Sequence, residues 1–275
     1  MMSAFNSVLS TVFDVVLAPF GHRQAWFDLL VWPVLAGVVA LLVYKRISNQ
    51  AGIARAKNGI VVNLLEVVLF RNDVVGVLGS TARALWQNLL YLGHNIVPML
   101  VMLIPMMAML VQLVAHYALD PVPVGSVDLL TVRIDPAMAT TVKPTDLRLE
   151  LPPGVTLDAP PVRTPDGEVV WRLRAAAEGD HVLRIHAGDR VIEKGIAVGG
   201  PPRKVPVMRT KGWEAFLYPA ERVMPAESPL YSIDLHYPDR PLRFFPDGEG
   251  GILAWFFVAS LAAGIALKNR FGVTL

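Results

Sequence analysis

Cysteine is absent from the 275-residue sequence, which excludes disulfide bonds, a thiolate nucleophile and any metal site built on cysteine. Charged residues are also scarce at 17%, whereas 53% of the residues are hydrophobic. This balance favours a chain that uses lipid as part of its solvent. The net charge of +2 is too small to indicate nucleic-acid binding, and no basic stripe with interleaved aromatic residues is present.

Motifs of common catalytic chemistry are missing as well. The sequence contains no glycine-rich phosphate loop, no Gly-x-Ser-x-Gly nucleophile elbow and no His-Glu-x-x-His zinc motif. His181 and His186 are five residues apart in a predicted strand, so we expect them on opposite faces, where they would not share a metal ion. We therefore expect no enzymatic activity, no cofactor and no metal.

Three apolar segments have the length of transmembrane helices, which need about 20 residues to cross ~30 Å of hydrocarbon. The predicted spans are residues 25–44, 96–117 and 249–268. The loop of residues 45–95 is rich in lysine and arginine, and the positive-inside rule places it in the cytoplasm. The tail of residues 269–275, which follows Lys268, is then cytoplasmic too.

This orientation predicts a multi-pass protein of a bacterial inner membrane, with a periplasmic N-terminus and a cytoplasmic C-terminus. Trp26, Tyr117 and Trp255 all fall at the predicted outer interface, where aromatic residues form a belt. Asp28, Gln112 and His116 lie near the outer ends of the spans. They are functional candidates if they face a cavity.

The N-terminal residues 1–24 lack the basic start and the cleavage pattern of a signal peptide. We predict an amphipathic helix on the outer membrane surface, with a disordered tail as the alternative. Its lipid-facing residues would be Phe5, Leu9, Val12, Phe13 and Val16.

Within the cytoplasmic loop, apolar stretches at residues 60–70 and 74–92 flank a turn at residues 71–73, which predicts a helical hairpin. The second arm repeats large apolar residues near helical spacing, which suits a helix at the cytoplasmic membrane surface or one packed on its own protein. These residues are Leu78, Leu85, Trp86, Leu89 and Leu92.

Between the second and third spans, residues 118–248 change to a period of two. After a proline-containing stalk at residues 120–125, apolar and polar residues alternate in about six short strands. This spacing predicts an immunoglobulin-like β-sandwich on the extracytoplasmic side, with Trp171 in its core. The predicted fold class is thus membrane α plus β.

The proline-rich stretch of residues 199–229 interrupts this alternation and is a candidate docking site for a periplasmic partner. Its aromatic and apolar residues could dip into the outer leaflet or cover the open edge of the sandwich. They are Trp213, Phe216, Leu217 and Tyr218.

Four methionines of the second span, Met99, Met102, Met106 and Met109, share one helix face. Methionine side chains repack easily, so this face suits partners of variable shape. Alternatively the methionines pack on the other two spans. Small residues would then form the helix contacts: Ala36, Ala40, Ala259, Ser260, Ala263 and Gly264.

The order of elements resembles the three-helix core of the YidC/Oxa insertase superfamily and of the insertase subunit of the ER membrane complex. An outside N-terminus, a cytoplasmic hairpin and a methionine-rich second span carry this resemblance over about half of the chain. It implies a groove, lined by Met99, Met102, Met106 and Met109, through which hydrophobic segments enter the bilayer. The inserted β domain, and the lack of a basic residue within the first span, depart from the bacterial members.

Two functions follow as hypotheses. The first is a non-enzymatic insertase-like or chaperone-like protein that acts on membrane proteins. The alternative is a structural or scaffold subunit of an envelope complex, whose periplasmic β domain binds a partner. The expected partners are the lipid bilayer and other membrane or periplasmic proteins.

Overall fold

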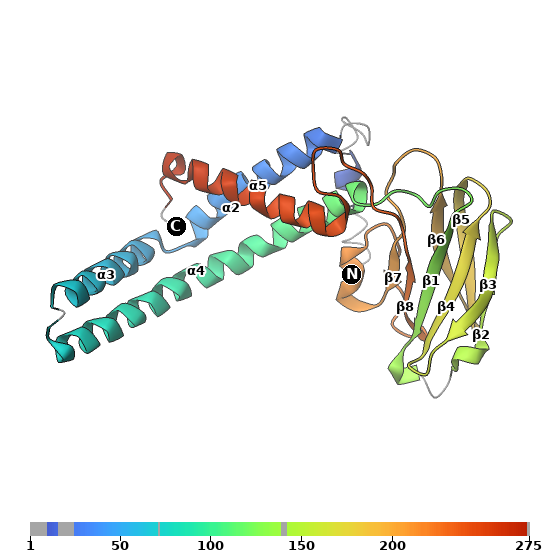
Figure 1. Cartoon of the computed structure of the whole chain (residues 1–275), viewed down its shortest axis with the longest axis horizontal. Coiled ribbons are helices and arrows are strands. Elements are labelled where there is room, and N and C mark those ends of the chain that lie inside the picture. Colours follow the sequence, from blue (N-terminus) through green and yellow to red (C-terminus); the bar gives the residue numbers. More distant parts are fainter. Residues whose placement is uncertain (1–9, 16–24, 71, 139–141, 274–275) are drawn as a thin grey trace. The chain divides into compact units, whose positions relative to one another are not determined.

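A computed structural model describes residues 10–15, 25–70, 72–138 and 142–273 (Figure 1). The chain divides into two compact units. The β unit comprises residues 1–29 and 110–255, and the helical unit comprises residues 30–109 and 256–275. The protein is therefore an α plus β chain.

Three helices are long and apolar enough to cross a membrane: α2 (Ala25–Ile47), α4 (Val74–Tyr117) and α5 (Gly248–Phe271). They contain the three predicted spans, and their length and composition support the prediction of a membrane protein. A further helix, α3 (Gln50–Leu69), begins at Asn49, whose side chain accepts a hydrogen bond from the Gly52 amide at 2.9 Å.

Helix α4 runs without a break through 44 residues, a length of about 66 Å at 1.5 Å per residue. It joins the predicted second hairpin arm to the predicted second span. Asn95, at the predicted junction, keeps its side chain within the helix by donating to the Tyr91 carbonyl at 2.6 Å. Pro98 and Pro105 lie inside α4 without ending it.

The helical unit has few buried side chains and depends on close helix contacts. At Gly37 of α2, an added Cβ would lie 2.3 Å from the Ser260 carbonyl oxygen of α5. Tyr44 of α2 donates a hydrogen bond to Asn95 of α4. Glycine at position 37 is thus required by the close approach of two backbones.

All strand pairs of the β unit are antiparallel, in one sheet of order β3-β4-β1-β8-β7 and a second of order β2-β5-β6. The strands are β1 (Val127–Ile134), β2 (Leu147–Glu150), β3 (Val155–Arg163), β4 (Glu168–Ala175), β5 (Gly179–Ala187), β6 (Arg190–Val198), β7 (Met208–Thr210) and β8 (Leu230–Leu235). Short 3-10 turns are η2 (Pro136–Met138), η3 (Pro144–Asp146) and η4 (Gly212–Leu217).

Both sheets contribute to one hydrophobic core. Trp171 on β4 and Leu130 on β1 are buried together with Leu183 and Ile185 on β5. These are the apolar positions of the alternating pattern, so the period of two indicated the core-facing residues. Trp171 is a core residue, as predicted.

Strand β3 lacked a clear sequence signal because it contains Pro160 and Pro161. It lies at the edge of the five-stranded sheet, where a missing amide proton breaks no ladder. Its register against β4 shifts twice between Leu157 and Val162.

One prediction about the outer interface changes. Tyr117 is fully buried, so it does not belong to a lipid-facing aromatic belt, whereas Trp26 is exposed. Residues 10–15 are helical, with Val12 exposed and Phe13 partly buried. Phe5, Leu9 and Val16 lie outside the described residues.

Candidate functional site

The four methionines of α4 do not have one common environment. Met99 is 60% exposed. Met102 packs against the cluster that contains Leu41 and Tyr44 of α2. Met106 and Met109 are partly buried. The stripe therefore combines helix packing with an open end at Met99.

The larger apolar surface lies on α3 and on the first half of α4, the segment that we name the arm (residues 50–92). Thirteen large apolar residues of the arm are each more than half exposed. They are Val61, Val62, Leu64, Leu65, Val68, Leu69, Phe70, Val74, Val75, Leu78, Leu85, Trp86 and Leu89. Because Leu78, Leu85, Trp86 and Leu89 are exposed, this face of α4 does not pack on the described part of the protein.

Polar side chains hold the two helices of the arm together. Glu66 of α3 accepts hydrogen bonds from Ser80 at 2.7 Å and from Arg83 at 2.8 Å, both on α4. Arg83 also donates to Asn63 at 3.1 Å. The hydrogen bonds from Ser80 and Arg83 lower the pKa of Glu66. This polar contact leaves the apolar residues of the arm pointing outward.

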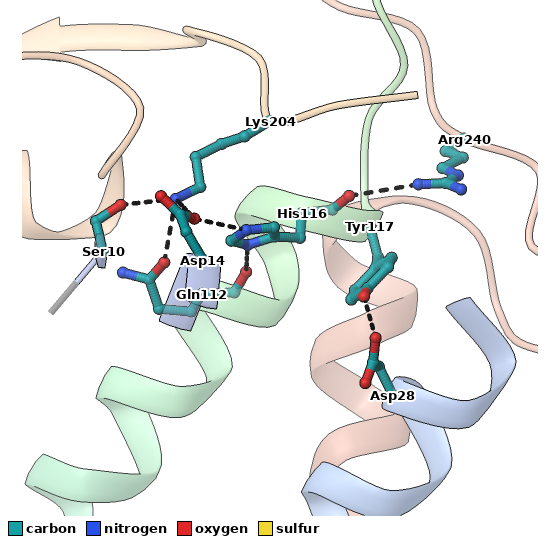
Figure 2. A network of polar contacts seen from close by, with 8 residues as sticks. All are labelled: Ser10, Asp14, Asp28, Gln112, His116, Tyr117, Lys204 and Arg240. Carbon is teal, nitrogen blue, oxygen red and sulfur yellow. Dashed lines mark hydrogen bonds and ion pairs between the residues drawn. The ribbon is translucent and has the colours of Figure 1, made fainter. Parts of the chain in front are cut away.

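A second polar network lies in the β unit, at the C-terminal end of α4 (Figure 2). The His116 ring is held between the Gln112 carbonyl oxygen at 2.7 Å and Asp14 at 2.9 Å. Lys204 donates to Asp14 at 2.8 Å and to Ser10 at 2.7 Å. The network thus joins the helical residues 10–15, α4 and the proline-rich stretch.

The last residue of α4 continues this network towards α2. Tyr117 donates a hydrogen bond to Asp28, which is fully buried (Figure 2). Arg240 lies over the Tyr117 ring, 5.7 Å from its centroid, and donates to the His116 carbonyl at 3.4 Å. Burial raises the pKa of Asp120, and the neighbouring Arg240 opposes this rise.

These contacts connect separate elements of the chain. Asp28 and His116 are buried, and each is hydrogen-bonded to a residue of another segment. Gln112 accepts from Lys204 at 3.4 Å, while its Nε2 has no hydrogen-bond partner within the described part of the chain. In residues 10–15, 25–70, 72–138 and 142–273, no group of His, Asp and Glu could hold a metal ion.

The four predicted contact residues of the proline-rich stretch differ in their exposure. Trp213 on η4 is 70% exposed, whereas Phe216, Leu217 and Tyr218 are partly buried. Leu217 and Tyr218 line a cavity of about 20 Å³. Burial raises the pKa of Tyr218, and nearby carboxylates, Glu249 first, raise it further.

The open edge of β6 is covered by other residues. Glu221 accepts from the Gly195 amide at 3.0 Å, and the Tyr237 hydroxyl accepts from the Ala197 amide at 3.1 Å. Arg209 donates to the Glu193 carbonyl. Lys194, fully buried, donates to Glu221 at 2.9 Å. Polar side chains thus satisfy backbone groups that an exposed edge would leave open.

Sequence reasoning did not find Asp14, Lys204, Arg240 or Glu221 as parts of these networks. Lys204 and Asp14 are 190 positions apart, and no local pattern connects them. The sequence analysis pointed only to Asp28, Gln112 and His116 in this region, as polar residues near the predicted outer ends of the spans.

No protein-family model matches the sequence, and no curated protein matches it. Among solved structures, the crystal structure of the S-layer protein rSbsC gives a TM-score of 0.23 at 17% sequence identity. That match covers 30% of this chain and 12% of the S-layer chain. So weak a likeness supports no conclusion about fold or function.

Proposed function

We propose that the protein is a non-enzymatic, insertase-like or chaperone-like protein of a bacterial inner membrane. The observation that carries this proposal is the apolar surface of the arm, which continues along α4 past Leu100 and Ile104. An exposed apolar surface of this extent is uncommon on a protein in water unless the surface binds an apolar partner or lipid. A hydrophobic segment of a client protein is a partner of this chemistry.

The proposed topology follows from length and charge. Helix α4 is about twice as long as the ~30 Å of hydrocarbon in a bilayer, so about half of it stands outside the lipid. The arm, which includes this half of α4, carries the basic residues Arg55, Lys57 and Arg83. By the positive-inside rule, these residues favour a cytoplasmic location for the arm. The arm is then a cytoplasmic hairpin, and the two sheets form an immunoglobulin-like sandwich in the periplasm.

The resemblance to the YidC/Oxa superfamily is part of this proposal. A client would move from the arm to the exposed Met99, whose flexible side chain adapts to different sequences. Met102, Met106 and Met109 lie further along the same face, where they are partly buried. They would contact the client only after α4 separates locally from its neighbours.

Photo-crosslinking in cells tests the proposal. A photoreactive residue at position 85 or 99 should form adducts with newly made membrane proteins, because Leu85 and Met99 are exposed along the proposed path. Leu261 on α5 is the matched control, since it is exposed to the same degree outside this path. Equal adduct yields at all three positions, or none at 85 and 99, would reject the proposal.

The alternative, a scaffold subunit of an envelope complex, is favoured by one observation. Trp213 is 70% exposed on η4, and exposed tryptophans are frequent anchors of protein interfaces. Purification in a mild detergent should then recover a stoichiometric partner that Trp213→Ala loses. A particle without a partner would argue against this function.

A further inference from the structure

The chain that precedes α5 folds back along the side of that helix. The ring centroids of Phe245 and Trp255 are 5.1 Å apart. An added Cβ at Gly251 would lie 2.6 Å from the Pro246 carbonyl group. Trp255 is seven residues into α5, about 10 Å from its start at Gly248. Residues 242–247, named the return loop, therefore lie beside the first two turns of α5.

Internal hydrogen bonds fix the shape of the return loop. The Leu242 amide donates to the Asp247 carboxylate at 2.7 Å, and the Phe244 amide donates to the Leu242 carbonyl at 2.6 Å. Arg243 between them has a φ of 62°, a value that side-chain-bearing residues rarely adopt. The loop is thus held in a conformation that a free chain would seldom visit.

This conformation turns one aromatic side chain outward. Leu242 is buried and Phe245 packs on Trp255, but Phe244 is 81% exposed. No other large hydrophobic residue in the described part of the chain is more exposed. Arg243, beside it, is also exposed.

We propose that the return loop is a lipid anchor, in which Phe244 inserts into the interfacial layer of the outer leaflet and Arg243 contacts lipid phosphates. The loop touches a residue two turns inside a helix that is long and apolar enough to cross the membrane. Phe244 is therefore at the depth of the bilayer surface rather than in bulk solvent. Aromatic rings concentrate at that depth.

Charge and continuity favour lipid over a protein partner. The positive Arg243 complements headgroup phosphates, and long basic side chains reach such groups while their stems stay in apolar surroundings. Leu253, on the adjoining first turns of α5, is exposed and continues the apolar surface. The anchor holds the base of the β unit against the bilayer, and it does so whether the protein is an insertase or a scaffold.

Spin labelling measures this depth directly, because the sequence has no cysteine to remove. The full chain with Phe244→Cys is labelled and reconstituted in nanodiscs of phosphatidylethanolamine and phosphatidylglycerol. The measured quantity is the ratio of label collisions with oxygen, which partitions into lipid, to collisions with a water-soluble nickel chelate. Leu253→Cys on α5 gives the lipid reference, and Val162→Cys, exposed on β3, gives the aqueous reference.

We expect the ratio at position 244 to shift from the Val162 value towards the Leu253 value. A ratio equal to that of Val162 overturns the proposal, and so does poor access of both reagents, which indicates a covering protein surface. Arg243→Cys provides a second labelled variant, expected between the two references. Phe244 makes few buried contacts, so its substitution leaves the fold intact.

Two neighbouring glycines test whether contact with α5 sets the depth. Gly251→Ala places a Cβ against Pro246, whereas a Cβ at Gly250 meets nothing within 4 Å. In the labelled background, Gly251→Ala should move the ratio at 244 towards the aqueous reference, and Gly250→Ala should leave it unchanged. An unchanged ratio in Gly251→Ala would contradict the proposed geometry.

Discussion

The two units of this protein bury apolar side chains to very different extents. In the β unit, residues from both sheets form one extensive buried core. In the helical unit, a small cluster around Leu41, Tyr44 and Ile53 is buried, while residues such as Ile104 and Leu261 are exposed. The β unit therefore has the burial of a domain folded in water, and the helical unit that of a structure completed by lipid or by apolar partners.

The β unit contains a buried charged side chain. Lys194 is fully buried and depends on Glu221 for its charge partner. The ion pair of Glu66 with Arg83 in the helical unit, by contrast, lies on an exposed helix surface. Loss of the partner of a buried charge should therefore be costly, and loss of one member of an exposed pair should be mild.

The largest effect is expected for Glu221→Ala. This change leaves Lys194 buried without its carboxylate and removes the acceptor of the Gly195 amide. Breaking a buried pair in this way costs about 3–5 kcal/mol of unfolding free energy. Pulse proteolysis of the detergent-solubilised protein in urea measures it. Glu168→Ala, which breaks an exposed pair with Arg133, should cost less than about 1 kcal/mol.

The pH dependence of the Glu221→Ala variant identifies the cause. Burial already lowers the pKa of Lys194 below the usual 10.5, although Glu221 opposes this, so loss of Glu221 lowers it further. In the alkaline window below pH 10.5 the unfolded chain then binds more protons than the folded one, and stability should rise with pH. The double variant Lys194→Met/Glu221→Ala should recover stability and lose this slope. A double variant as unstable as the single one would assign the loss to the Gly195 amide.

A pair of leucine truncations compares the two units directly. Leu183→Ala on β5 removes a fully buried side chain and should cost about 2–5 kcal/mol. Leu261→Ala on α5, 63% exposed, should change stability by about 0.5 kcal/mol or less. The same proteolysis assay measures both. Similar losses would show that Leu261 packs against a protein surface in the native assembly.

Elements with a strong period were predictable from the sequence. Hydropathy indicated α2, α4 and α5, and alternation indicated the core positions of β1 and β4. Strand β3 was missed because Pro160 and Pro161 weaken its pattern, and its edge position became clear only from the sheet order. Local propensity describes an element, whereas an edge is a property of the whole sheet.

The candidate surfaces were predictable only in part. Helical spacing places four methionines on one face, but spacing does not say what that face contacts, and Met99 is exposed while Met102 is packed. The outward turn of Phe244 depends on the backbone of Arg243 and on the contact of Phe245 with Trp255. Such tertiary contacts leave no periodic signal.

An intermediate effect is expected where α2 meets α5. Gly37→Ala inserts a methyl group against the Ser260 backbone and should destabilise the helical unit by about 1–3 kcal/mol. Gly264→Ala is the control, because an added Cβ there meets nothing within 4 Å. Thermal aggregation in a single detergent compares the two variants. If Gly37→Ala is as stable as Gly264→Ala, the two helices do not depend on this close contact.

The smallest effect is expected in the arm. The pKa of Glu66 is lowered by Ser80 and Arg83, so its contribution to holding α3 on α4 is present above the ordinary value of 4.5 and is lost as the pH falls through the lowered pKa. Spin labels at Val62→Cys and Leu85→Cys, both exposed, measure the separation of the two helices. Their distance distribution should broaden slightly on acidification. Arg83→Ala should already broaden it at pH 7 and weaken its response to acid, because Glu66 then keeps only Ser80. An equal response with and without Arg83 would mean that the arm is held by its apolar contacts alone.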